Sequence, residues 1–132
     1  IGQLSKSKDI VRRRQEIATT FTQELDEFKD RIQLPSCPAD RTHSYMLYGI
    51  VLNNEPKTKL VNHLEHLNVE TRDLLPLINQ SIYKRLYGNL EVKYPVAKHI
   101  NESGFYTGCH PYMSEDEVGF IIEAFKTFFQ NS

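Results

Sequence analysis

The adjacent residues Cys109 and His110 have the side-chain types of a thiol nucleophile and its general base. Neighbouring residues of an extended backbone point to opposite faces, so these two cannot form a reactive pair with each other. A thiol enzyme would need His43 or His99 to meet Cys109 in space. The flanking glycine and proline favour a turn in which the cysteine packs as a small apolar side chain. We expect this turn rather than a catalytic dyad.

A metal site is a second chemical possibility, because His63 and His66 lie three positions apart on a predicted helix. A zinc site needs further ligands, and the chain has neither an HExxH nor a CxxC motif. Glycine-rich phosphate loops of the GxGxxG or P-loop type are absent as well. Surface histidines are the simpler interpretation, and the sequence assigns no metal ligand and no catalytic residue.

The polar stretch ETRDLLPLINQSIYKRLY, residues 70–87, offers groups suited to ligand binding. Arginine supplies a planar fork for phosphate or carboxylate, and side-chain amides suit hydroxyl-rich ligands such as sugars. Loops between ordered elements commonly carry such contacts, although ordinary loop polarity would look the same. The candidate substrate-binding residues are Thr71, Arg72, Asn79, Gln80 and Tyr83.

Bulk composition narrows the possible partners. The chain has 132 residues, which predicts one domain, and a net charge of −1, which gives no general attraction to nucleic acid. No apolar run reaches the roughly 20 residues that a membrane span needs, and no secretory signal is present. Two cysteines are too few for a disulfide framework, so we expect a reducing cytoplasmic location.

The elements that must position these residues begin with a long helix. Seven apolar residues are spaced by 7, 7, 3, 4, 3 and 4 positions: Leu4, Val11, Ala18, Phe21, Leu25, Phe28 and Ile32. This spacing predicts a helix of about 45 Å, ended by Leu34 and Pro35. A domain of this size is only about 30 Å across, so the amino-terminal half should pack on protein outside this chain. A coiled-coil dimer is the alternative.

The remaining pattern predicts a small α/β layer, of α+β type, with a short, mostly antiparallel sheet covered by helices. Ser114 and Glu117 form a capping-box pattern that opens the final helix, with an apolar stripe from Val118 to Phe129. The other predicted elements are a strand at 43–52, a helix from Pro56, a strand at 68–72, a loop with one helical turn at 73–89, a helix at 93–100 and a strand at 104–106.

Four stretches, taken in order, resemble one known family. They are IGQLSKSKDIVRRRQEIATTF, SYMLYGIVL, LEHLNVETR and YPVAKHINESGFYTGCHPYMSEDEVGFIIEAFKTFF. They are similar to the carboxy-terminal small domain of the DegT/DnrJ/StrS sugar aminotransferases. The first resembles the helix that leaves the large domain, and the last resembles the closing turn with His-Pro and the terminal helix. Many members carry a histidine in the polar loop, where this chain has Ile78 and Asn79.

The resemblance implies a fold-type I enzyme that uses pyridoxal phosphate (PLP). Such enzymes move an amino group, usually from glutamate, to a keto carbon of a nucleotide-linked deoxysugar, and they work as homodimers. The cofactor's lysine would lie in the large domain, upstream of this chain, so the chain alone is expected to be inactive. The small domain would contact the sugar nucleotide through the loop that carries Thr71, Arg72, Asn79, Gln80 and Tyr83.

The domain organisation follows from this resemblance. Residues 1–34 are expected to be the helix that links to the large domain, and residues 35–132 to be the small domain. The chain starts at Ile1 without a methionine, which suggests a piece of a longer protein. Two alternatives stay open: a PLP-dependent sugar dehydrase of the same family, and a free-standing binding module that dimerises through its first helix.

Overall fold

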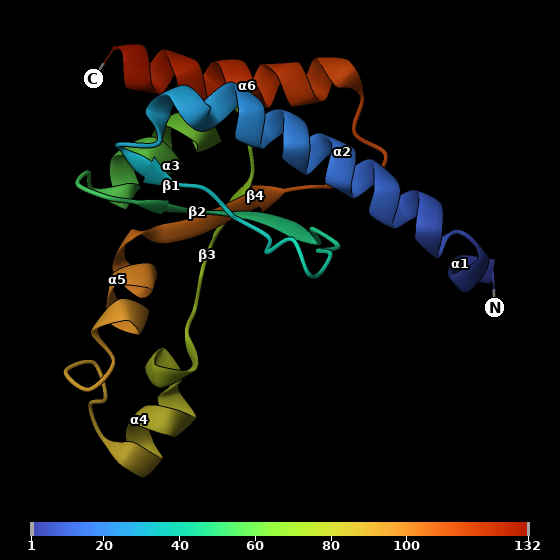
Figure 1. Ribbon diagram of the computed structural model, residues 1–132. Helices are drawn as coiled ribbons and strands as arrows, with labels where there is room; N and C mark the ends of the chain where they lie inside the picture. Colours follow the sequence, from blue (N-terminus) through green and yellow to red (C-terminus); the bar gives the residue numbers. More distant parts are fainter. Residues whose placement is uncertain (1, 132) are drawn as a thin grey trace.

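The computed structural model describes residues 2–131, with helices on both sides of a small sheet (Figure 1). Ile1, where the predicted linking helix begins, and Ser132 lie outside the described residues. The elements in chain order are α1 (Gly2–Ser5), α2 (Ser7–Leu25), η1 (Asp26–Phe28), β1 (Ile32–Gln33), β2 (Leu47–Leu52), α3 (Lys57–His66), β3 (Thr71–Asp73), η2 (Leu77–Asn79), α4 (Ser81–Tyr87), α5 (Pro95–Ser103), β4 (Gly104–Gly108) and α6 (Glu115–Gln130).

The sheet is built around β2 and β4, which pair in register from Leu47 opposite Gly108 to Val51 opposite Gly104. β1 adds to the free edge of β2, and β3 adds to the free edge of β4, in the order β1-β2-β4-β3. Every neighbouring pair is antiparallel. The predicted fold class, a small α/β domain with a short antiparallel sheet covered by helices, is therefore confirmed.

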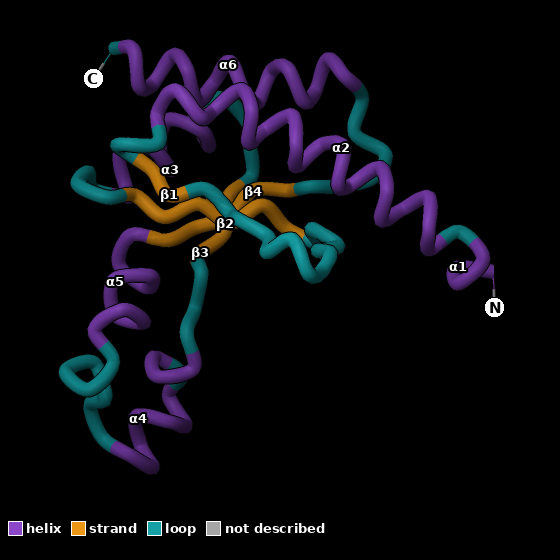
Figure 2. The backbone as a smooth tube through the Cα atoms, viewed as in Figure 1, coloured by secondary structure: helices purple, strands orange, loops and turns teal. Residues whose placement is uncertain are grey.

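One face of the sheet is covered by α2, α3 and α6 (Figure 2). Alternate residues of the central strand β2 are buried, and they form the hydrophobic core together with residues of these helices. Tyr48 of β2 and Phe105 of β4 have no exposed surface. Phe21 of α2 meets Tyr48 edge-on, with ring centroids 5.1 Å apart, and Phe125 of α6 stacks on Phe105 at 6.3 Å. We call this combination of sheet face and covering helices the helical layer.

The predicted start of the final helix is confirmed. The Ser114 hydroxyl accepts from the Glu117 amide at 3.1 Å, and the Ser114 amide donates to the Glu117 carboxylate at 2.8 Å. This reciprocal pair satisfies two of the backbone donors that a helix leaves without partners at its start. The Ser114 amide and the Ser114 hydroxyl, which lies 3.1 Å from the same carboxylate oxygen, both donate to the Glu117 carboxylate and hold its pKa below the ordinary value.

The prediction of one continuous first helix is wrong in its carboxy-terminal part. α2 ends at Leu25, a 3-10 turn follows, and Ile32 lies in β1, paired with Leu52. Ile32 is buried, as its apolar character required, but it reaches the core from a strand. Pairing with the edge of β2 satisfies backbone groups that a longer helix would have left uncovered there. No described side chain before Ile17 is buried, and packing of this half on protein outside the chain stays a prediction.

Two strand boundaries differ from the sequence prediction because of local backbone geometry. Tyr45 has a φ of +43°, so the strand expected from residue 43 begins only at Leu47. Asn68 has a φ of +60°, and the Val69 amide donates to the Leu64 carbonyl at 2.9 Å, which closes α3 in a Schellman-type turn. The strand expected at residues 68–72 is accordingly displaced to β3, residues 71–73.

The connection between β3 and β4, residues 74–103, projects from the sheet on the side opposite the helical layer (Figure 1). We call it the arm. It contains η2, α4 and α5, so the predicted loop with one helical turn at residues 73–89 is wrong in extent. The helix expected near Pro95 is confirmed and runs on to Ser103.

Candidate functional site

Thr71 and Arg72, the first two candidate substrate-binding residues, are neighbours on the edge strand β3 and point to opposite faces of the sheet. Thr71 is buried, and its hydroxyl donates to the Glu65 carboxylate of α3 at 2.9 Å. This hydroxyl is therefore occupied by a contact that ties β3 to α3. The role of Thr71 as a substrate contact stays a prediction.

Arg72 is exposed and lies on the face that the helical layer leaves uncovered. Its guanidinium donates twice to one carboxylate oxygen of Glu70, at 3.0 and 2.6 Å. This contact with a carboxylate raises the pKa of Arg72 above its ordinary value. The remaining guanidinium donors still face solvent, so an anionic ligand could bind beside the existing ion pair.

The other three candidates gather on the arm. Asn79 ends η2, Gln80 follows it, and Tyr83 lies in the first turn of α4. Asn79 is half-buried, and its side-chain oxygen has no hydrogen-bond partner among the described residues. The Tyr83 ring lies 6.0 Å from that of Tyr87. The structure thus places Asn79, Gln80 and Tyr83 together, while Thr71 and Arg72 lie in β3, which leads into the arm.

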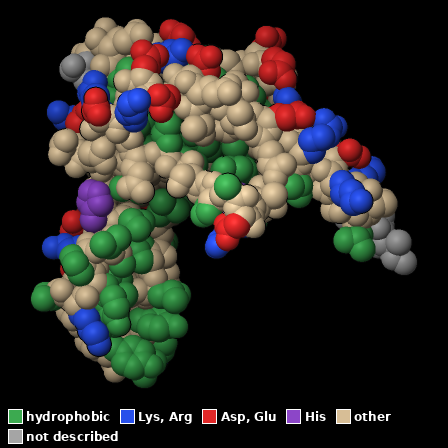
Figure 3. All heavy atoms as spheres, viewed as in Figure 1, with side chains coloured by type: hydrophobic (Ala, Val, Ile, Leu, Met, Phe, Trp, Pro, Cys, Tyr) green, Lys and Arg blue, Asp and Glu red, His purple; other side chains and the backbone are tan. Residues whose placement is uncertain are grey.

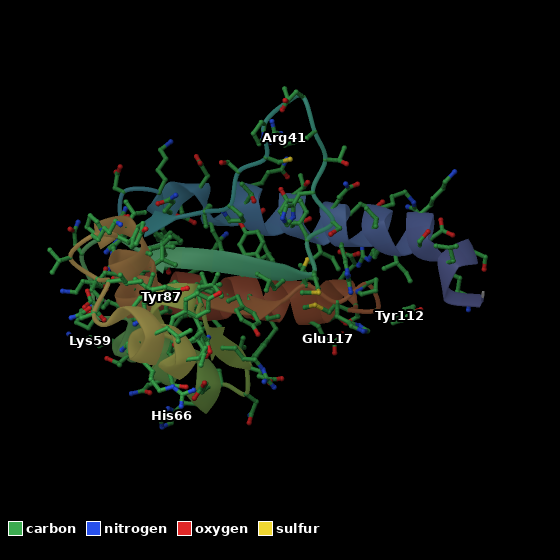
Figure 4. The ribbon with its side chains drawn as sticks, turned by 90° about the horizontal axis from the view of Figure 1, so that it is seen from below. Arg41, Lys59, His66, Tyr87, Tyr112 and Glu117 are labelled. Carbon is green, nitrogen blue, oxygen red and sulfur yellow. The ribbon has the colours of Figure 1, made fainter. Side chains whose placement is uncertain are left out.

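A groove of about 830 Å³ beside β3 was not predicted from the sequence. It runs between β3, β4 and the first half of α6, and its lining includes Val69, Tyr106, Met113, Phe120 and Ile121. Phe120 stands half exposed on the outer side of α6, and this break in the polar face was the available sequence signal. Glu117, which also lines the groove, lies near Tyr112 at the start of α6 (Figure 4). Its carboxylate is occupied by the helix cap, and Glu70, Arg72 and Asp116 add charged groups to a lining that is otherwise largely apolar.

Cys109 occupies the predicted structural position rather than a catalytic one. The side chain is 1% exposed, and its thiol donates to the Arg14 carbonyl at 3.4 Å. Burial raises the pKa of the thiol to about 11, the opposite of what a thiolate nucleophile requires. His110 is exposed, and its Nδ1 accepts from the Tyr112 amide at 3.4 Å. The turn interpretation of this stretch is confirmed by these contacts.

The histidines of α3 make structural contacts. His63 is half-buried, lies 3.0 Å from the Ala124 carbonyl of α6 and packs on Phe128 with ring centroids 5.5 Å apart. His66 lies 2.6 Å from the carbonyl of Asn62 one turn earlier. Among the described residues no group of three His, Cys, Asp or Glu side chains could hold a metal ion.

Lys57 has a structural role at the base of the arm. Lys57 is the most enclosed lysine in an ion pair, with 13% of its side chain exposed. Its ammonium donates to the Asp73 carboxylate at 2.7 Å and to the carbonyls of Asn101 and Gly104 at 3.0 and 3.3 Å. These three acceptors use its full donor capacity, so Lys57 anchors both ends of the arm instead of holding a cofactor.

Fold and site together define a class: a small α+β domain with a well-formed core and a polar loop between β3 and β4. The chain belongs to the DegT/DnrJ/EryC1/StrS aminotransferase family, whose model matches residues 1–126. No helix among the described residues is long and apolar enough to cross a membrane.

The curated relatives of this chain are longer proteins. GDP-perosamine synthase of Escherichia coli O157:H7 is 25% identical over 133 residues, which covers 99% of this chain and 35% of that protein. An uncharacterized protein of Methanocaldococcus jannaschii is 26% identical, over 96% of this chain and 34% of its own length. The chain therefore spans about a third of the curated relatives that it matches.

Solved structures agree on the fold. The putative sugar aminotransferase Spr1654 of Streptococcus pneumoniae, in its PLP-form, superimposes with a TM-score of 0.81 at 23% identity, covering 98% of this chain and 33% of that one. The same protein has also been solved in a PMP-form. A family member from Brucella abortus gives a TM-score of 0.77 at 25% identity, over 96% of this chain and 33% of its own. The PLP and PMP forms agree with the cofactor that the sequence resemblance implied.

Proposed function

We propose that this chain is the small domain of a PLP-dependent aminotransferase that moves an amino group, from glutamate, to a keto carbon of a nucleotide-linked deoxysugar. The observation that carries the proposal is the family match over residues 1–126, in a chain that spans about a third of its relatives. The missing two thirds would supply the cofactor lysine, and PLP would act there as the electron sink. The full-length protein would act as a cytoplasmic homodimer.

The role of this domain would be to bind and orient the sugar nucleotide. Arg72 offers unused guanidinium donors to a phosphate or carboxylate. The amide oxygen of Asn79 is buried and has no partner among the described residues, so a ligand donor would satisfy it. Gln80 and Tyr83 add polar groups beside Asn79 on the arm. Thr71 would position β3 through its bond to Glu65. These contacts suit a ligand with hydroxyl groups and negative charge.

The first test is the full-length protein from its complete gene, assayed with glutamate and nucleotide-linked keto sugars. We expect it to bind PLP and to form an amino sugar, while residues 1–132 alone form none. Removing a charge-assisted hydrogen bond costs about 1.5–3 kcal/mol, so Arg72→Ala should raise KM for the sugar nucleotide about 10- to 100-fold. A dehydrated, nitrogen-free product would instead identify a dehydrase.

Arg41→Ala is the matched control for this substitution. Arg41 is as exposed as Arg72, and it pairs with its neighbour Asp40 as Arg72 pairs with Glu70. It lies on the loop between β1 and β2, well away from Tyr87 on the arm (Figure 4). Equal changes in KM for the two variants would remove Arg72 from the proposed substrate site.

A further inference from the structure

Three consecutive arginines of α2, Arg12, Arg13 and Arg14, lie on different sides of the helix and differ in their partners. The Arg12 guanidinium donates to the Glu16 carboxylate at 2.8 Å, and that of Arg13 to the Glu115 carboxylate of α6 at 2.7 Å. Figure 3 shows side chains of both charges close together along α2. The Arg14 guanidinium takes no part in this pairing, because among the described residues it has neither a hydrogen-bond acceptor nor a carboxylate within ion-pair distance.

Arg14 lies on the core-facing side of α2. Ile17, Ala18 and Phe21 follow it by three, four and seven positions, which places all four side chains on one face of the helix. The three apolar residues are each 1% exposed. Arg14 is half-buried, and its Nε is shielded from solvent without a hydrogen-bond partner among the described residues. Burying a donor without an acceptor is costly, above all in a charged group, so this position requires an acceptor that the described residues do not provide.

Two segments that reach this part of α2 provide no counter-charge. The Cys109 thiol, in the turn before α6, donates to the Arg14 carbonyl at 3.4 Å. The Gln15 amide donates at 3.0 Å to the first carbonyl of residues 43–46, the end of the loop before β2. Neither this loop end nor the turn, residues 108–114, contains an Asp or a Glu. A negatively charged acceptor for Arg14 therefore has to come from outside these two segments.

Tyr45 supplies a second donor without a partner near Arg14. Its φ of +43° is unusual for a residue with a side chain, and the bond from its amide to Nδ1 of His43 at 2.9 Å holds this conformation. The ring packs at the margin of the core, and its hydroxyl makes no hydrogen bond with the described residues. The pKa of Tyr45 is raised by burial first, then by the negative charges that Cys37 and Cys109 acquire as thiolates. The ring is therefore close to Cys109, and Cys109 contacts Arg14.

We infer that Arg14 and Tyr45 form a binding site for an oxyanion, either a phosphate or a carboxylate group. A guanidinium presents two parallel N–H groups that match two oxygens of such a group, and the tyrosine hydroxyl adds a third donor. The terminal nitrogens of Arg14 are not enclosed as its Nε is, so they meet the ligand first. Rotation of the side chain then brings the Nε–H to a second oxygen. The site contains none of the five candidate substrate-binding residues, and the inference does not rest on the proposed function.

Titration of residues 1–132 with inorganic phosphate, at an ionic strength kept constant with NaCl, tests the inference. The Nε–H signals of Arg12, Arg13 and Arg14 are followed by ¹⁵N nuclear magnetic resonance. We expect the Arg14 signal to shift and to saturate with a dissociation constant of about 1–10 mM, the range for one charge-assisted pair. The Arg12 and Arg13 signals should change little, because both guanidinium groups already have carboxylate partners. An Arg14 signal that stays constant, or that moves with the other two without saturating, would overturn the inference.

Arg14→Met removes the guanidinium and keeps an apolar stem, and Arg12→Met is the control with the same change in net charge. Phosphate at ten times the dissociation constant should raise the folding equilibrium constant of the unsubstituted chain and of Arg12→Met about tenfold, measured by urea titration. Arg14→Met should lack this gain. Phosphate also strengthens burial in general, and that contribution is common to all three chains. An equal gain in all three chains would contradict the site. A large loss of stability in Arg14→Met without phosphate would do so too, because it would show that the guanidinium already has its partners.

Tyr45→Phe tests the second donor, because it removes the hydroxyl and keeps the ring. The loss of one hydrogen bond should weaken phosphate binding about 3- to 10-fold in the same titration. The Arg14 signal should still shift, since the guanidinium remains. Phosphate binding of unchanged affinity in Tyr45→Phe would overturn the assignment of Tyr45 to the site.

The same measurement on the full-length protein identifies the source of the oxyanion. An Arg14 signal that still responds to phosphate assigns the site to a free ligand. An Arg14 signal that is already shifted without phosphate, and returns on acidification through about pH 4, assigns it to a carboxylate of the protein outside residues 1–132. An Arg14 signal that responds to neither phosphate nor acid would overturn the inference. None of these outcomes involves PLP or amino transfer, so the proposed function is left to its own test.

Discussion

The helical layer and the arm have similarly apolar sequences. Their apolar side chains are buried in the helical layer and exposed in the arm. The helical layer buries Phe21, Tyr48, Phe105 and Phe125 to 1% exposure or less. The arm has no buried residue and leaves Val92 90% exposed. Both regions form helices, so local helix propensity does not distinguish them. What distinguishes them is whether a second element lies against the apolar face.

The largest change in the free energy of unfolding should come from removing a large side chain from the core of the helical layer. Phe125→Ala removes a ring stacked on Phe105 and leaves a cavity that the packed helices cannot fill. We expect the free energy of unfolding to fall by about 3–5 kcal/mol, measured by urea titration of residues 1–132. A loss below about 1 kcal/mol would mean that the layer is loosely packed, and the contrast with the arm would disappear.

An intermediate effect should appear at alkaline pH, because two ionisable side chains, Cys109 and Tyr48, are buried in the helical layer. Burial raises the pKa of Cys109 to about 11 and that of Tyr48 to about 12. The unfolded chain loses these protons at lower pH than the folded chain, so stability is complete below about pH 9 and falls as pH rises toward the folded pKa values. Cys109 alone should account for a loss of about 2 kcal/mol by pH 11.

Cys109→Ala measures this contribution, with Cys37→Ala as the control. Cys37 is exposed, so its removal should leave the pH dependence as it is in the unsubstituted chain. The Cys109→Ala variant should lose about 2 kcal/mol less between about pH 8 and pH 11, as followed by urea titration at each pH. Parallel pH profiles for all three chains would show that Cys109 is not shielded from solvent.

The smallest change in the free energy of unfolding should come from replacing an exposed side chain of the arm in residues 1–132. Val92→Ser replaces the most exposed of the arm's large apolar side chains, and it removes no buried contact. We expect the free energy of unfolding of residues 1–132 to change by no more than about 0.5 kcal/mol in urea titration. A loss above about 1 kcal/mol would reveal a core within the arm and would end the comparison with the helical layer.

Several elements of the fold could be predicted because their causes are local. The capping box at Ser114 and the apolar stripe after it correctly placed α6, and Pro95 correctly placed the start of α5. The glycine and proline around Cys109 correctly indicated a turn. The colinear resemblance of four stretches indicated the family, which the match over residues 1–126 shows. The candidate site on the arm stays a prediction, although the structure brings Asn79, Gln80 and Tyr83 together.

The features that the sequence could not reveal depend on contacts between distant residues. Ile32 fits a helical stripe by spacing, yet it pairs with Leu52 because the edge of β2 lies there to accept it. No local motif marks Lys57 in the sequence, but the two ends of the arm converge on its ammonium. The groove beside β3 joins residues that are as far apart in sequence as Val69 and Phe120.

By itself, then, the sequence determined the family, the fold class and the elements whose start or end is set by neighbours a few residues away. The tertiary structure alone decided which apolar stripes are covered and which remain open. Helical spacing predicts that one face of a helix is apolar. Whether that face is buried depends on a second element, from elsewhere in the chain, that packs against it. For α6 that surface is formed by α2, α3 and Phe105 of the sheet. For the arm, the described residues provide none.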